Sequence, residues 1–306
     1  MGRPRALALL GVCLTLATLP ATASAGTVFY STANIQFSGK LWSVRDDGSH
    51  RRLLRSGVFT GPSGVVATLS RNGKRILCLC RQGEVDSMKL DGSGMKQIGV
   101  RPRGTRYDTV ELCAGGETLW MEERRDRLMI EDADGSHARV VVHGGHGLFV
   151  EEDFAISPDG KKVAFVGFHG RPAEVWIVPL GGGPKQRVYR SAGEREIHQL
   201  QWSQNSRSLA FVDYPIEEKY EIPADPDEHF LISSGGPARE VQVGPPASPG
   251  EAFFSPGGSL MALPGEVPGT LYSVSRSGHV HQRLLGERCG EVQCTFGPTA
   301  FGWLHH

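Results

Sequence analysis

The chain has 306 residues, of which 39% are hydrophobic, with 40 glycines and 19 prolines. These proportions describe a globular, turn-rich protein with enough apolar residues for a large core. The formal net charge is zero, so no excess of basic charge favours nucleic acid, and we expect no nucleic-acid partner.

Residues 1–25 have the three parts of a secretory signal peptide. A short basic start, MGRPR, precedes the apolar run ALALLGVCLTLATL, and small residues end the segment at ATASA. The run is shorter than the roughly twenty residues of a comfortable membrane span. We therefore expect cleavage after Ala25 and a periplasmic or extracellular protein formed by residues 26–306, without a transmembrane segment.

The mature chain opens with three predicted strands, in the stretch GTVFYSTANIQFSGKLWSVRDDGSHRRLL. A pattern then repeats, which we follow from the residue that ends the first apolar run of each repeat, such as Ser157 in FAISPDGKKVAFVG. These marker residues stand 43, 44, 46, 52 and 42 residues apart, at Ser70, Cys113, Ser157, Ser203, Ser255 and Gly297. Further short runs rich in Val, Ile, Leu and Phe follow each marker, separated by Gly, Asp, Asn, Ser or Pro. Four short strands per repeat predict the blades of a β-propeller.

The two ends of the chain complement each other. The N-terminal stretch supplies three strands of a blade without a first strand, and EVQCTF near the C-terminus supplies a first strand. Pairing the last strand with the N-terminal blade would close the ring and remove an open sheet edge. The sequence therefore predicts an all-β, six-bladed propeller of four-stranded blades, closed in this way, and we expect a monomer.

The cysteines and histidines give no metal-binding pattern. Cys78 and Cys80, in LCLC, fall on one face of a strand, where we expect buried unpaired thiols that pack as small hydrophobic residues. In CGEVQC, a local disulfide between Cys289 and Cys294 and a pair of free thiols both remain open. We interpret HGGHG, residues 143–147, as a solvated glycine-rich loop.

The first strand of each blade lies nearest the channel in this architecture, and its residues alternate in polarity. Apolar residues occupy one set of positions: Leu69, Leu112, Ile156, Trp202, Phe254 and Phe296. The other set is mostly polar, which predicts a polar and somewhat acidic channel. Our candidate binding residues there are Glu111, Asp153, His198, Gln199, Gln201 and Glu251. They could bind a cationic peptide or a divalent cation, or they could simply line a hydrated tunnel.

The longest repeat contains an insertion, DYPIEEKYEIPADPDEHF, at residues 213–230. Its prolines exclude a regular strand, and its acidic and tyrosine residues suit a protruding loop that contacts a partner. We name as contact residues Tyr214, Glu217, Glu218 and Tyr220. A tolerated surface insertion explains the segment equally well.

SPDGKKVAF followed by VWIVPLGGG, and LWSVRDDGSHRRL near the start, resemble the repeats of the TolB-type six-bladed propeller of bacterial envelope proteins. The resemblance covers the mature chain, although CAGGE replaces the motif in the second blade. It implies an envelope propeller with protein partners. We expect the α/β domain that precedes the TolB propeller to be missing, which places a role in the Tol system in doubt.

Catalysis finds little support in the sequence. No Gly-x-Ser-x-Gly motif occurs, and the marker serines are explained by turn formation. The leading hypothesis is an exported, non-catalytic scaffold that binds an envelope or extracellular protein and needs no cofactor. The rival is a propeller enzyme, a hydrolase or lyase, that uses Glu111, Asp153, Glu251 and His198 in the channel.

Overall fold

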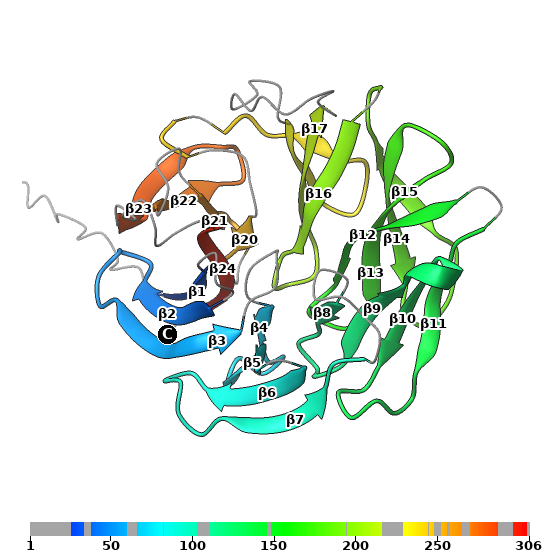
Figure 1. Ribbon diagram of the computed structural model, residues 1–306. Coiled ribbons are helices and arrows are strands. Elements are labelled where there is room, and N and C mark those ends of the chain that lie inside the picture. The colour runs from blue at the N-terminus through cyan, green and yellow to red at the C-terminus, as the bar shows by residue number, and fades with distance from the viewer. Residues whose placement is uncertain are drawn as a thin grey trace, which may run out of the picture.

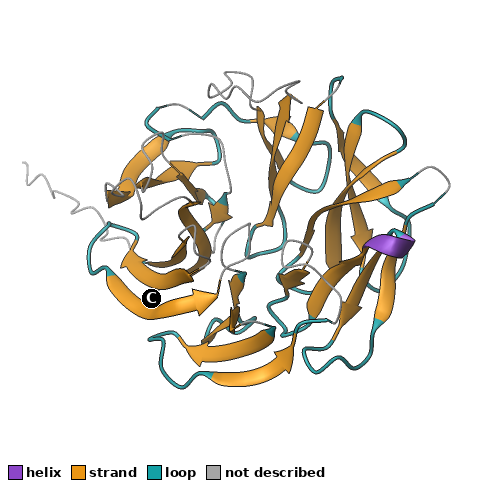
Figure 2. Cartoon of the chain, in the orientation of Figure 1, coloured by secondary structure: helices purple, strands orange, loops and turns teal. Residues whose placement is uncertain are grey.

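The computed structural model describes residues 26–33, 38–59, 66–81, 83–102, 110–145, 148–193, 195–215, 229–243, 245–247, 252–255, 258–264, 270–286 and 296–304. They form six four-stranded antiparallel sheets that stand around a common centre (Figure 1). One short 3₁₀ helix, η2 (Glu123–Arg125), interrupts the strands and turns of these ranges (Figure 2). No helix in them is long and apolar enough to cross a membrane. The predicted all-β, six-bladed propeller is confirmed.

The first sheet joins the two ends of the chain. Its strands, in spatial order, are β24 (Phe296–Leu304), β1 (Thr27–Ala33), β2 (Ser38–Arg45) and β3 (Arg52–Phe59). β24 runs antiparallel to β1, with Leu304 opposite Thr27 and Phe296 opposite Ala33. The last strand thus pairs with the N-terminal blade as predicted, but it is formed by residues 296–304 and not by the predicted EVQCTF, of which residues 291–295 lie outside the described residues.

The remaining sheets each use four consecutive strands, of which the first lies toward the centre (Figure 1). The second blade consists of β4 (Ala67–Leu69), β5 (Arg75–Arg81), β6 (Glu84–Lys89) and β7 (Lys96–Val100). The third consists of β8 (Val110–Leu112), β9 (Thr118–Glu122), β10 (Arg127–Glu131) and β11 (Arg139–His143). The fourth consists of β12 (Phe149–Ile156), β13 (Lys162–Phe168), β14 (Ala173–Pro179) and β15 (Gln186–Arg190). The fifth consists of β16 (Arg195–Trp202), β17 (Leu209–Pro215), β18 (His229–Ser233) and β19 (Arg239–Glu240). The last is β20 (Phe253–Phe254), β21 (Leu260–Pro264), β22 (Thr270–Ser275) and β23 (Val280–Gly286).

The marker serines close the turns that give the sequence its repeat. Ser157 Oγ accepts a hydrogen bond from the backbone N of Lys162 at 2.9 Å and donates one to Asp159 Oδ1 at 2.7 Å. The backbone N of the residue five positions on is bound in the same way at three other markers: Ser70, Ser203 and Ser255. A hydroxyl at this position therefore organises the hairpin between the first and second strands.

The core lies between neighbouring blades. One apolar cluster combines residues of the β12–β15 blade, such as Val166 and Val175, with residues of the β16–β19 blade, such as Phe211. The apolar positions of the first strands are buried as expected where their side chains are described: Leu69, Leu112, Ile156, Trp202 and Phe254. Each blade thus buries its faces against two neighbours, which explains the even spacing of the repeats.

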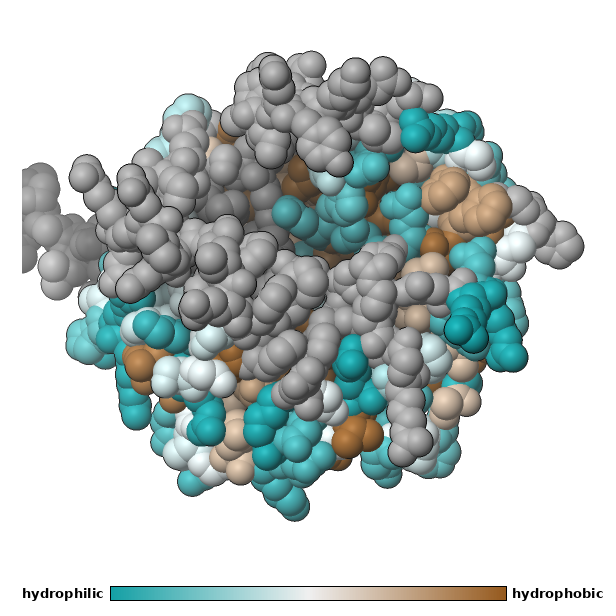
Figure 3. Space-filling model, viewed as in Figure 1, coloured by the Kyte–Doolittle hydropathy of each residue, from teal (hydrophilic) through white to brown (hydrophobic). Residues whose placement is uncertain are grey.

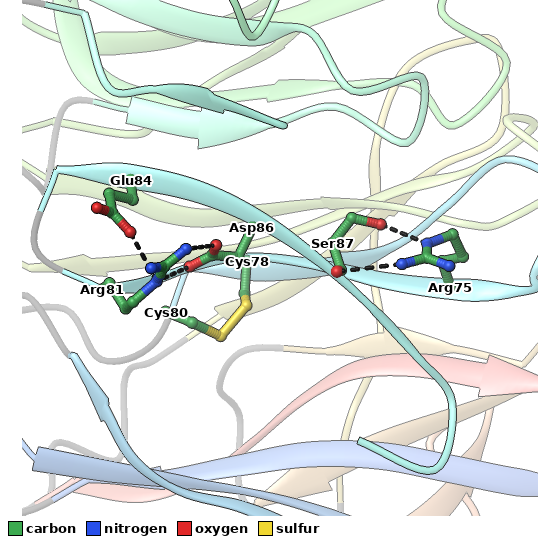
Figure 4. The surroundings of a disulfide bond; sticks show 7 residues. All are labelled: Arg75, Cys78, Cys80, Arg81, Glu84, Asp86 and Ser87. Carbon is green, nitrogen blue, oxygen red and sulfur yellow. Dashed lines mark hydrogen bonds and ion pairs between the residues drawn. A yellow bond between two sulfur atoms is a disulfide. The ribbon is translucent and has the colours of Figure 1, made fainter. Parts of the chain in front are cut away.

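The expectation of unpaired thiols at Cys78 and Cys80 is wrong, because the two residues form a disulfide (Figure 4). Their Cα atoms are 5.1 Å apart, whereas residues two positions apart in a regular strand are separated by roughly 6.6 Å. The pairing of β5 with β6 is irregular between Cys78 and Arg81, so the strand is contracted where the bond forms. Both residues are buried in an apolar cluster, as expected. Cys289 and Cys294 lie outside the described residues.

Candidate functional site

A cavity of about 600 Å³ opens where the marker turns of several blades meet at one end of the ring. The ends of the first strands supply much of its apolar wall: Leu69, Leu112, Ile156, Trp202 and Phe253. Polar side chains from the same strands and from the turns complete it: Arg71, Asn72, Glu111, Asp159, Gln201, Gln204 and Asn205. A mixed, concave lining of this size is typical of ligand sites. Hydrophilic side chains are also visible in the hollow at the centre of the face shown in Figure 3.

Glu111 connects two blades at this cavity. Its Oε2 atom accepts a hydrogen bond from the backbone N of Ile156, on the first strand of the next blade, at 3.1 Å. A carboxylate bonded to a backbone N–H is held in place by a charge-assisted hydrogen bond. Glu111 therefore helps to hold the β8–β11 and β12–β15 blades together.

Asp153 makes the corresponding connection one blade further on. Its Oδ1 accepts from the backbone N of Gln199 at 3.0 Å, and its Oδ2 is bound to Nδ1 of His198. The other ring nitrogen of His198, Nε2, lies 3.2 Å from Glu196 Oε2. The Tyr214 ring stacks on the imidazole, with 5.0 Å between centroids and 20° between planes. Asp153, His198, Glu196 and Tyr214 thus form one inter-blade cluster, which we call the His198 cluster.

The surroundings of His198 determine its charge. Burial alone would lower its pKa, but the hydrogen bonds and negative charges of Asp153 and Glu196 outweigh that effect and raise the pKa to about 9. The ring is therefore an imidazolium at neutral pH, and both of its nitrogens donate to carboxylates. A histidine held in this way is a poor general base at pH 7.

The backbone of β16 is irregular at Gln199. Its φ is +62°, and the pairing of β16 with β17 shifts between His198 and Gln201. β12 has a similar irregularity between Val150 and Phe154. These bulges turn the first halves of the two strands relative to their second halves, so Gln199 is exposed while Gln201 faces the cavity.

The structure divides the predicted channel residues into two groups. Glu111 and Gln201 line the cavity, whereas Asp153, His198 and Gln199 meet beyond its lining, toward the starts of the first strands. Glu251 lies outside the described residues. The binding role of all six stays a prediction.

Of the four residues predicted to contact a partner, only Tyr214 is among the described residues. Tyr214 is part of β17 and packs on His198, so its assignment to a protruding loop is wrong. Pro215, the next residue, ends the strand without preventing Tyr214 from pairing with Glu196. Glu217, Glu218 and Tyr220 lie outside the described residues.

Sequence reasoning missed two sets of residues at these places. The turn residues that line the cavity, such as Arg71 and Asn205, are absent from the predicted site residues, although each follows the end of a first strand. Glu196 was missed although it is two residues from His198, a spacing that places the two side chains on the same face of a regular strand. Among the described residues, no three His, Cys, Asp or Glu side chains are arranged to hold a metal ion.

Comparison with known proteins gives partial matches. No family model matches the chain. The Tol-Pal system protein TolB of Xylella fastidiosa is 30% identical over 125 residues, which cover 39% of this chain and 27% of that protein. TolB from Acinetobacter baumannii has a similar structure, with a TM-score of 0.61 and 16% identity, over 90% of this chain and 66% of that chain. The structure of an oligogalacturonate lyase in complex with manganese is similar with a TM-score of 0.51 and 16% identity. The match covers 83% of this chain and 77% of that chain.

These matches cover only part of the relatives, since the chain spans 27% of the first TolB and 66% of the second. The identities to the solved structures support a shared fold and nothing further. By its fold and by its local sequence similarity, the chain is a TolB-like six-bladed β-propeller.

Proposed function

We propose that this propeller is an exported, non-catalytic scaffold of the cell envelope that binds a protein partner at the cavity formed by the marker turns. One observation carries the proposal: the first-strand carboxylates of Glu111 and Asp153 are bonded to backbone amides of the next blade. They stabilise a rigid ring whose turns surround a cavity of mixed polarity. A rigid framework that presents loops around a concave surface is suited to recognition.

The export and envelope parts of the proposal have separate support. The local similarity to TolB, a Tol-Pal system protein, favours the envelope. The amide N of Gly26 lies 2.7 Å from Asp46 Oδ2. Cleavage after Ala25 would make this nitrogen an ammonium group, and Asp46 is placed to pair with it. Mass spectrometry of the mature protein tests this step, and a chain that retains residues 1–25 in the envelope fraction would contradict it.

Site-specific photo-crosslinking in the producing cell tests the binding surface. The photoreactive residue replaces Gln201 in the cavity in one strain, and Gln97, exposed on the outer strand β7, in the control strain. We expect a protein adduct from position 201 and none from position 97. No adduct at 201 from a folded, exported variant, or the same adducts at both positions, would overturn the proposal.

The enzyme alternative rests on the structural similarity to the lyase and on the His198 cluster. If His198 acts as a proton donor in a lyase or hydrolase, His198→Gln abolishes turnover of an acidic oligosaccharide by the purified protein. If the protein is a scaffold, wild type and variant are equally inactive, while crosslinking at 201 persists.

A further inference from the structure

A second cavity, of about 590 Å³, lies between the outer part of the β8–β11 blade and the β12–β15 blade. Its wall is formed by the end of β11, the turn after it, and side chains beside β13, β14 and β15: His143, Gly144, Gly145, Leu148, His169, Trp176 and Lys185. The two blades are bound together next to it, because Arg139 Nη1 donates to the carbonyl O of Leu180 at 3.1 Å. We call this space the inter-blade cavity.

Among the described residues that line the inter-blade cavity, the charged or titratable side chains are basic; the carboxylates nearest to them, Glu174 beside His169 and Asp126 beside Gly144, are not part of the wall. Lys185 and His143 are exposed, and neither side chain has a hydrogen-bond or ion-pair partner among the described residues. Two basic groups at one opening, without a neighbouring carboxylate in the lining, favour an anion over a cation.

The third basic residue, His169, lies beside a buried acid. The Glu174 side chain is 5% exposed, and its Oε1 accepts from Arg187 Nη1 at 2.6 Å and lies 3.7 Å from Arg190 Nε. Its Oε2 is 3.5 Å from His169 Nδ1. Because Glu174 faces Nδ1, Nε2 is the ring nitrogen of His169 that is left for a ligand.

Trp176 gives the inter-blade cavity an aromatic wall. The ring packs against the buried apolar cluster that contains Leu148 and Val142. Its centroid lies 6.1 Å from that of His169, nearly edge-on, and Arg187 Cζ is 5.9 Å from it. Fixed on several sides, the indole offers a preorganised apolar surface next to the basic groups.

We propose that the inter-blade cavity binds a small organic acid with a sugar or aromatic ring, whose ring packs on Trp176 and whose carboxylate is bound by His143, His169 and Lys185. The volume is in the range of small-molecule sites. The carboxylate would accept charge-assisted hydrogen bonds from Lys185 and His143, which have no partner among the described residues, and a further bond from Nε2 of His169.

Isothermal titration of the whole purified chain with galacturonate, methyl galactoside and inorganic phosphate tests the proposal. We expect galacturonate to bind and the neutral glycoside not to bind. Lys185→Gln, at an exposed position, should weaken galacturonate binding roughly tenfold through loss of one charge-assisted bond. Trp176→Phe should weaken it less, and Gln97→Ala, on the distant strand β7, should leave it unchanged.

Three results would overturn the proposal. Absence of galacturonate binding at millimolar concentration would remove the site, as would binding that Lys185→Gln leaves unchanged. Phosphate binding as tight as that of galacturonate would show a general anion site without selection for a ring. Melting curves of Lys185→Gln and Gln97→Ala, compared with wild type, show that each variant is folded.

Discussion

At the scale of single residues, His198 has a charge that depends on its two carboxylate neighbours. Its pKa is raised from 6.5 to about 9, so the folded state binds a proton that the unfolded chain releases between these values. The ion pairs therefore contribute fully below about pH 6.5, and their contribution is lost as the pH rises through about 9. We expect the NMR titration of the His198 ring to have its midpoint near pH 9.

Asp153→Asn provides the comparison for this titration. Removal of one negative charge and one charged acceptor should move the His198 midpoint toward its ordinary value. The unfolding free energy of wild type should fall between pH 6.5 and 9 relative to that of His198→Gln. A wild-type midpoint near 6.5 would contradict the charge that we assign to the ring.

The Cys78–Cys80 disulfide is a second property of single residues that can be measured directly. Alkylation of the unfolded, unreduced protein should leave both cysteines unmodified, while Cys113, a buried free thiol, reacts and serves as the internal control. The bond closes a very short loop, so it restricts the unfolded chain little. Replacement of both cysteines by alanine should cost about 2 kcal/mol, mainly through lost packing. Alkylation of all three without reductant would contradict the bond.

At the scale of elements, Glu111 is a contact between two first strands that a point variant can remove. Glu111→Ala leaves the Ile156 amide without its acceptor, which should cost about 1–2 kcal/mol. In Glu111→Gln the side-chain carbonyl can still accept, so this variant is the control. Hydrogen exchange at Ile156 should be faster in the alanine variant than in the glutamine variant, and equal rates would show that Glu111 does not connect the blades.

The strands and their order could be predicted from the sequence because marker turns and apolar runs are local signals. The Ser157 turn needs only residues 157–162, and the markers Ser70, Ser203 and Ser255 show it again. The His198 cluster depends instead on a bulge in β16 and on a partner 45 residues earlier in the chain. Alternation alone placed Gln199 and Gln201 on one face, and the positive φ of Gln199 separates them.

Two features of the candidate sites could not have been predicted in this way. The contraction of β5 at Cys78 coincides with a register shift in its pairing with β6, which the letters LCLC do not specify. The inter-blade cavity brings His143 together with Trp176 and Lys185, which lie on another blade. Such contacts depend on how two blades pack, whereas a repeat pattern specifies only that they are neighbours.

At the scale of the whole molecule, β24 decides whether the ring has an open edge. Its pairing with β1 covers residues 27–33, and Leu304 also packs in the apolar cluster of β1, β2 and β5. A chain that ends before Phe296 would leave the backbone groups of β1 unpaired and expose this cluster. We expect its unfolding temperature to fall by at least about 10 °C, since a whole strand's pairing and burial are lost. We also expect it to self-associate in size-exclusion chromatography. Removal of residues 305–306 alone is the matched control and should change neither property. If the shorter chain stays monomeric and melts like the control, the N-terminal blade is stable without its innermost strand, and the two ends of the chain do not hold the propeller together.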